Sequence, residues 1–238
     1  MMPLKDNIPS RRTPVVTIGL VVVNVAVFLI EAMMGQRATV ITSTFGVVPQ
    51  RFTSAWLNPM QLLTLFTSMY LHGGWAHLIG NMLYLWIFGD NVEESMGRLR
   101  FFIFYTLSGL VAVLIQVAAA PGLDKPIIGA SGAIAGVLGA YLLLFPQARV
   151  QTLVPSFYFY RLIWLPAIIV LGGWFLIQLL NGLASINVNM QTGGVAWWAH
   201  IGGFAAGMLL QFVFKRSDYE PPSRRLDQRR ARSRGIRW

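Results

Sequence analysis

Six apolar stretches, separated by polar segments, divide the chain. They cover approximately residues 14–30, 69–88, 101–120, 131–145, 162–180 and 197–214. A helix needs roughly 20 predominantly apolar residues to cross a bilayer, and five of the stretches approach that length. The fourth is shorter, because it begins at Ser131 and stops before Pro146, so that as a helix it would be only about 22 Å long. The pattern predicts an all-α polytopic membrane protein with six transmembrane helices, the fourth of them short.

The composition supports a membrane protein. Of the 238 residues 12% are charged and 55% are hydrophobic, whereas soluble domains carry about 25% charged residues. The mean hydropathy is +0.57. The chain has no cysteine, which excludes disulfides and thiolate metal sites.

Charge distinguishes three segments: a polar arm at 1–13, the membrane domain at 14–214, and an Arg-rich tail at 215–238. We expect the tail to be disordered and to contact anionic lipid headgroups. It explains much of the net charge of +10, and its only aromatic residues are Tyr219 and the terminal Trp238. No nucleic-acid partner is therefore expected.

Six crossings place both termini on one side of the membrane. Sixteen of the 19 Lys and Arg residues lie on that side, and only three lie in the loops at 35–68, 121–129 and 181–196. Because positive residues favour the cytoplasmic side, we expect cytoplasmic termini and outward-facing loops. The N-terminal stretch has no clean cleavage site, and we expect a prokaryotic plasma (inner) membrane.

Polar side chains within the apolar stretches each carry an energetic cost, and four of them are candidates for a shared site. His77 and Asn81 are four residues apart and share one face of the second predicted helix. Ser131 begins the fourth helix, and His200 lies about one turn into the sixth. With the predicted topology, all four fall at a similar depth on the outer side.

Small residues indicate that the fourth and sixth helices pack closely. Gly132 and Gly136 form one small-residue face, and Gly203 and Gly207 form another. If these faces meet, Ser131 and His200 come together.

This arrangement suits nucleophilic acyl transfer. His200 would act as the base that activates the Ser131 hydroxyl. Backbone N–H groups at the helix start, with His77 and Asn81, would stabilise an oxyanion. No third, acidic member of the site is evident, since Asp90, Glu93 and Glu94 lie at the opposite, cytoplasmic end of the second helix. We therefore predict a Ser–His dyad without a carboxylate.

Other interpretations stay open at this point. A serine in an apolar helix often donates to a backbone carbonyl, and histidines often join helices through hydrogen bonds. Two histidines could also bind a metal, although without nearby Asp, Glu or Cys they form a poor ligand set. A transporter or channel using the same polar groups is a further alternative, but no internal repeat is visible.

Over about residues 14–214 the chain resembles the rhomboid intramembrane serine proteases. The matching motifs are His77-x-x-x-Asn81, Gly129-Ala130-Ser131-Gly132 and Ala199-His200-x-x-Gly203. The resemblance implies a six-helix bundle around the short central fourth helix. It implies that Ser131 and His200 are catalytic, that His77, Asn81 and the Ser131 N–H form the oxyanion hole, and that no cofactor is needed.

The resemblance also implies single-pass transmembrane proteins as substrates, cut in or near the outer leaflet. Trp174, Phe175 and the 181–196 loop would gate their entry, and the 35–68 loop would lie partly in the outer leaflet. One departure concerns the residue four after Ser131, which is aromatic in some members of the family but Ala135 here. The alternative within the family is a catalytically silent protein that binds transmembrane clients.

Overall fold

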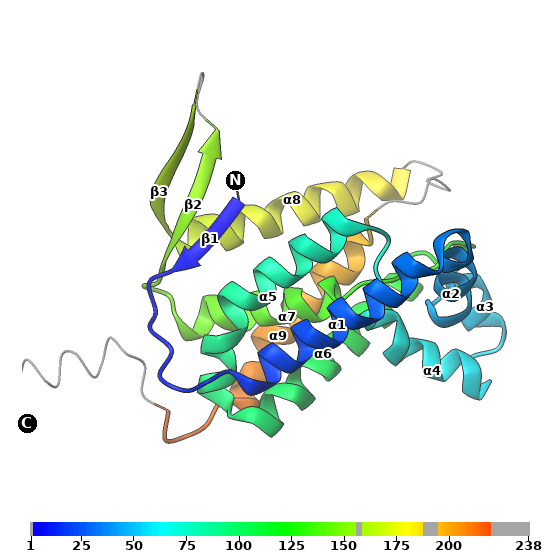
Figure 1. Ribbon diagram of the computed structural model, residues 1–238, viewed down its shortest axis with the longest axis horizontal. Helices are drawn as coiled ribbons and strands as arrows, with labels where there is room; N and C mark the ends of the chain where they lie inside the picture. Colours follow the sequence, from blue (N-terminus) through cyan, green and yellow to red (C-terminus); the bar gives the residue numbers. More distant parts are fainter. Residues whose placement is uncertain (1, 156–158, 188–194, 220–238) are drawn as a thin grey trace, which may run out of the picture.

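Helices account for most of the computed structural model, which describes residues 2–155, 159–187 and 195–219. Six longer helices form a bundle (Figure 1): α1 (Val15–Met33), α5 (Trp75–Met96), α6 (Arg98–Ala119), α7 (Ser131–Leu144), α8 (Ala167–Asn187) and α9 (Trp197–Phe214). Short elements connect α1 to α5 at one end of the bundle: η1 (Gly35–Arg37), α2 (Ala38–Phe45), α3 (Pro49–Ser54), α4 (Pro59–Thr67) and η2 (Ser68–Tyr70).

The short helix α7 is the most buried of these helices. It contacts α5, α6, α8 and α9, and its most extensive contact is with α9. A Cβ atom added to Gly203 would lie 2.1 Å from the carbonyl oxygen of Gly132, and one added to Gly207 would lie 1.9 Å from that of Gly136. The predicted contact between these two glycine faces is therefore confirmed, and only glycine permits so close an approach.

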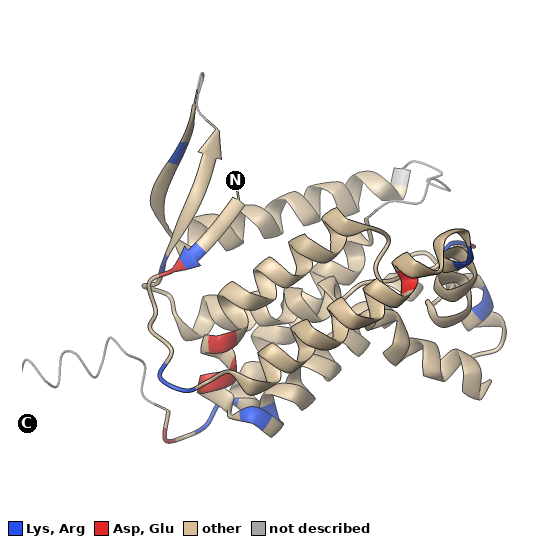
Figure 2. Ribbon diagram, in the orientation of Figure 1, with Lys and Arg blue, Asp and Glu red and all other residues tan. Residues whose placement is uncertain are grey.

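The bundle belongs to an integral membrane protein. Four of the described helices are long and apolar enough to cross a bilayer: α1, α6, α8 and α9. Helix α7 has 14 residues, and α5 carries polar side chains such as His77 and Asn81 along its length. Figure 2 shows the charged residues gathered toward the two ends of the bundle and in the strands, while most of the length of the helices carries none.

A three-stranded antiparallel sheet adjoins the bundle, which the hydropathy pattern did not predict. Its order is β1-β2-β3, formed by β1 (Met2–Asp6), β2 (Arg149–Pro155) and β3 (Tyr160–Pro166). Much of the segment between the fourth and fifth predicted helices is therefore strand, and the predicted fifth span begins too early, since α8 starts only at Ala167. The cause is that a short apolar run such as 160–166 suits a strand as well as a helix.

Other predicted helix ends also differ from the structure. Helix α8 continues to Asn187, so the first part of the predicted 181–196 loop is helical, and residues 188–194 lie outside the described part. Helix α5 begins at Trp75 rather than near residue 69 and continues to Met96, beyond the end of the apolar stretch at residue 88. The Glu93 carboxylate accepts hydrogen bonds from the backbone N–H groups of Val16 and Thr17 at the start of α1, which explains why an acidic residue is kept inside this helix.

Candidate active site

Ser131 is the first residue of α7, and its hydroxyl faces the base predicted for it. The Oγ atom of Ser131 lies 2.8 Å from Nε2 of His200, which is buried in the second turn of α9. The close glycine contact between α7 and α9 sets this distance. The chain reaches Ser131 through Gly129, whose φ of +119° is a backbone conformation that favours glycine.

The second ring nitrogen of His200 faces an amide rather than a carboxylate. Its Nδ1 atom lies 2.7 Å from Oε1 of Gln178, a buried side chain on α8. Gln178 is not among the site residues predicted from the sequence, although a glutamine in an otherwise apolar stretch was a usable signal.

An aromatic ring accompanies the imidazole, and it comes from α8 rather than from α7. The Trp174 ring lies 5.6 Å from the His200 ring, with an interplanar angle of 35°. The departure at Ala135 therefore does not leave the imidazole without an aromatic neighbour.

His77 and Asn81 lie against Gly129, two residues before the nucleophile. A Cβ atom added to Gly129 would lie 2.8 Å from Nε2 of His77 and 3.7 Å from Nδ2 of Asn81. The Gly73 N–H donates to Nδ1 of His77 over 3.4 Å, which leaves the ring proton on Nε2. Nδ2 of Asn81 is buried and has no hydrogen-bond partner among the described residues. Two donors thus lie beside the start of α7, where backbone N–H groups are also free.

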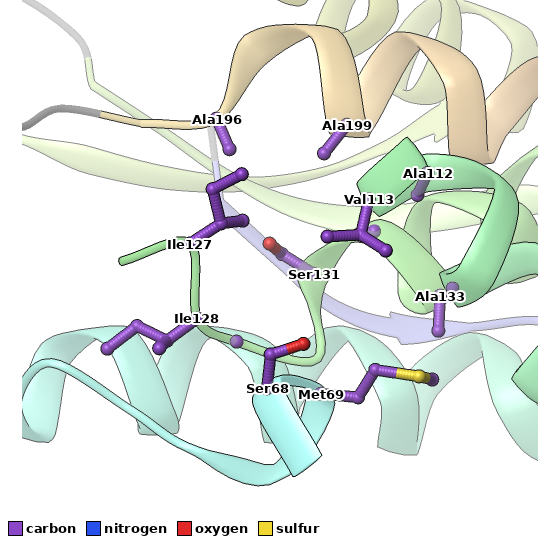
Figure 3. A pocket seen from close by; sticks show the side chains of 13 residues that line it. Ser68, Met69, Ala112, Val113, Ile127, Ile128, Ser131, Ala133, Ala196 and Ala199 are labelled. Carbon is purple, nitrogen blue, oxygen red and sulfur yellow. The ribbon is translucent and has the colours of Figure 1, made fainter. Parts of the chain in front are cut away.

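A small cavity of about 20 Å³ lies beside Ser131. Figure 3 shows the Ser131 side chain among those of Ser68, Ile127 and Val113 that line it. A cavity of at least about 10–15 Å³ has room for one water molecule. The site therefore has space for the second reactant of a hydrolysis beside the serine.

His72 lies next to the site but takes another position. Its backbone N–H donates to Oε2 of Glu31 over 3.2 Å, and its ring packs edge-on against His77 at 5.1 Å. Its two ring nitrogens have no partner within the described ranges. No group of three or more His, Cys, Asp or Glu side chains in the described part of the chain is placed to hold a metal ion.

The two residues predicted as a substrate gate both lie on α8. Trp174 contacts His200 directly, and Phe175 stacks on Phe204 of α9 with ring centroids 4.6 Å apart. Together with Gln178 they form the face of α8 that meets α9. Most of the loop that follows lies outside the described residues.

Comparison with known proteins relates the chain to one family. A sequence model described as the Rhomboid domain matches residues 59–217. RHOMBOID-like protein 6, mitochondrial, of Arabidopsis thaliana is 33% identical over 153 residues, which are 63% of this chain and 42% of that protein. Rhomboid protein 1, mitochondrial, of Saccharomyces cerevisiae is 29% identical over 69% of this chain and 45% of its own length. The rhomboid YdcA of Bacillus subtilis is 32% identical over 63% of this chain and 65% of its own length. The chain thus spans less than half the length of the first two relatives.

Proposed function

Because the chain belongs to the rhomboid family, we propose that it is an intramembrane serine endopeptidase that cleaves single-span transmembrane proteins in or near the outer leaflet. The observation that carries the proposal is the 2.8 Å contact between Ser131 Oγ and His200 Nε2. A serine hydroxyl is a weak nucleophile until a neighbouring base accepts its proton. This contact supplies such a base.

The proposed reaction follows from the positions of these groups. Nε2 of His200 accepts the hydroxyl proton while Oγ of Ser131 attacks the peptide carbonyl carbon. The carbonyl oxygen becomes an oxyanion that accepts hydrogen bonds from the Ser131 N–H, from Asn81 Nδ2 and from His77 Nε2–H. His200 then returns the proton to the leaving amine, and a water molecule activated by the same base hydrolyses the acyl-enzyme.

The fold supports a site below the membrane surface. We propose that α1, α5, α6, α7, α8 and α9 all cross the membrane, with both termini cytoplasmic. Helix α7 has only 14 residues, so its start at Ser131 lies within the bilayer. Irregular backbone at that depth is tolerated where protein or water surrounds it, and the bend at Gly129 meets that condition.

Substrate entry and lipid contact complete the proposal. A transmembrane substrate would reach Ser131 past Trp174 and Phe175, the α8 residues that pack on α9. The Arg-rich tail would bind anionic headgroups. A prokaryotic plasma membrane stays a prediction, since two of the relatives have mitochondrial in their names.

Reconstitution tests the function. Purified protein in liposomes is incubated with a panel of single-span membrane proteins, and the fragments are sequenced. We expect wild type to cut within or near the transmembrane segment, Ser131→Ala to cut nothing, and Ser95→Ala, which replaces a buried serine in α5, to behave as wild type. Equal cleavage by wild type and Ser131→Ala would rule out Ser131 as the nucleophile. Client binding without cleavage would favour a catalytically silent rhomboid.

A further inference from the structure

The imidazole of His200 has a hydrogen-bonding neighbour at each of its two nitrogens. Nε2 lies 2.8 Å from Ser131 Oγ, and Nδ1 lies 2.7 Å from Oε1 of Gln178. Gln178 is only 5% exposed, and it belongs to α8, whereas His200 belongs to α9. A third helix therefore contributes to the contact between nucleophile and base.

The chemistry of these atoms determines where the imidazole proton lies. A neutral imidazole carries one N–H, and an amide oxygen can only accept a hydrogen bond. The contact with Oε1 therefore places the proton on Nδ1 and leaves the lone pair of Nε2 directed at the Ser131 hydroxyl. We propose that Gln178 is the positioning residue of His200, which fixes the tautomer and the ring orientation that the proposed protease reaction requires. This inference rests on the proposed function.

Other neighbours of the ring do not supply this hydrogen bond. Trp174 and Trp197 contact the imidazole through their rings, at centroid distances of 5.6 and 6.4 Å. These contacts restrict the plane of the ring, but an indole has no hydrogen-bond acceptor. Position 135, four residues after the nucleophile, is a buried alanine. The amide of Gln178 is thus the acceptor that selects one tautomer.

The position of Gln178 also links the base to α8. Trp174 and Gln178 are four residues apart and lie on the same face of this helix. The opposite face of α8 is exposed, for example at Leu176 and Leu180. The catalytic orientation of His200 therefore depends on α8 packing against α9. If a substrate displaces α8 on entry, the base is complete only after α8 returns.

Substitutions of Gln178 test the role. Gln178→Leu keeps most of the volume but removes the acceptor, and we expect kcat to fall roughly 10- to 100-fold with little change in KM. Gln178→Glu keeps an acceptor oxygen and should restore kcat to within about tenfold of wild type. Gln211→Leu is the matched control. Gln211 is also a buried glutamine, but it lies on α9 away from the His200 ring nitrogens, and its replacement should leave kcat unchanged.

A measurement on the wild-type protein separates this inference from the proposed function. The chain has three histidines, so ¹⁵N NMR of the labelled rings, assigned with a His200 variant, shows which nitrogen of His200 carries the proton. We expect Nδ1–H in wild type and a change in Gln178→Leu. A proton on Nε2, or an unchanged kcat in a folded Gln178→Leu protein, would overturn the role of Gln178. If wild type cleaves no substrate but shows Nδ1–H, the proposed function fails while the positioning of His200 stands.

Discussion

The side chain of Asn81 carries a hydrogen-bond donor that lowers the stability of the resting protein. Its Nδ2 group is buried without a partner among the described residues, and such a group costs about 1–3 kcal/mol of stability. The same group lies beside Gly129, close to where an oxyanion would form. A donor left unpaired in the resting protein can gain its hydrogen bond in the transition state, which is when it lowers the barrier.

Asn81→Ala should lower activity without lowering stability. We expect kcat to fall roughly 100-fold, because one oxyanion donor is lost, while KM changes little. Thermal stability should be maintained or raised, because an unsatisfied buried donor disappears. Asn24→Ala is the control, since Asn24 is a buried asparagine on α1 with an unpaired Oδ1. An Asn81→Ala protein with wild-type kcat would exclude Asn81 from the oxyanion hole.

Ser131 and His200 could be predicted as candidate site residues from the sequence, because polar side chains that share one depth are conspicuous in apolar helices. Whether they touch depended on packing, and the glycine faces of α7 and α9 bring them to 2.8 Å. Gln178 was missed because nothing in the sequence shows that α8 packs on α9. Only that packing places the Gln178 amide beside the His200 ring. A linear pattern predicts the face and depth of a residue but does not identify its neighbours.

The elements themselves were predictable to different degrees. Helix α9 has the predicted bounds, and α7 ends one residue early, because apolar length and Pro146 define them. The sheet was missed, since β1 and β2 are separated by more than 140 residues and pairing over that distance leaves no local pattern. The extension of α5 was missed because the acidic residues Glu93 and Glu94 accept hydrogen bonds from the N-terminal segment.

A disulfide between α8 and α9 tests whether α8 must move away from α9 for a transmembrane substrate to enter. A Cβ atom at Gly182 would lie 3.6 Å from Cβ of Trp197, which is within the range for a disulfide. The chain has no other cysteine. In the Gly182→Cys/Trp197→Cys protein we expect oxidation to lower cleavage of transmembrane substrates at least tenfold, and reduction to restore it.

The two single-cysteine variants serve as controls for this experiment. The oxidised double variant should still react with a small fluorophosphonate, because Gln178 and His200 stay in contact while α8 is held on α9. Undiminished cleavage of transmembrane substrates by the cross-linked protein would show that α8 does not need to move.

At the scale of the whole molecule, Asp6 ties the N-terminal strand to the bundle. Its Oδ2 atom accepts hydrogen bonds from the Tyr141 hydroxyl of α7 at 2.5 Å and from Nδ2 of Asn91 of α5 at 2.9 Å. Burial raises the pKa of the Asp6 carboxyl to about 6, and its charged neighbours are Lys5 and Asp90. The docked strand therefore holds the Asp6 proton more tightly than the unfolded chain does.

Docking of β1 should consequently weaken as the pH rises. The stabilisation from the protonated carboxyl is complete below about pH 4, declines toward pH 6, and is absent above it. Hydrogen exchange corrected for intrinsic rates should show roughly tenfold greater protection of β1 at pH 5 than at pH 7.5. Asp6→Asn should abolish this difference, and Asp124→Asn, at an exposed position, should keep it. Protection of β1 that rises with pH would contradict the assignment.

The proposed reaction depends above all on the activation of the Ser131 nucleophile by His200. The most direct measurement is mass spectrometry of peptides from the membrane-reconstituted protein after treatment with a fluorophosphonate, which forms a covalent bond with activated serines. We expect an adduct on Ser131, none on the other serines, and loss of the adduct in His200→Ala. An unmodified Ser131 in the folded wild-type protein, or equal labelling of Ser131 in His200→Ala, would contradict it.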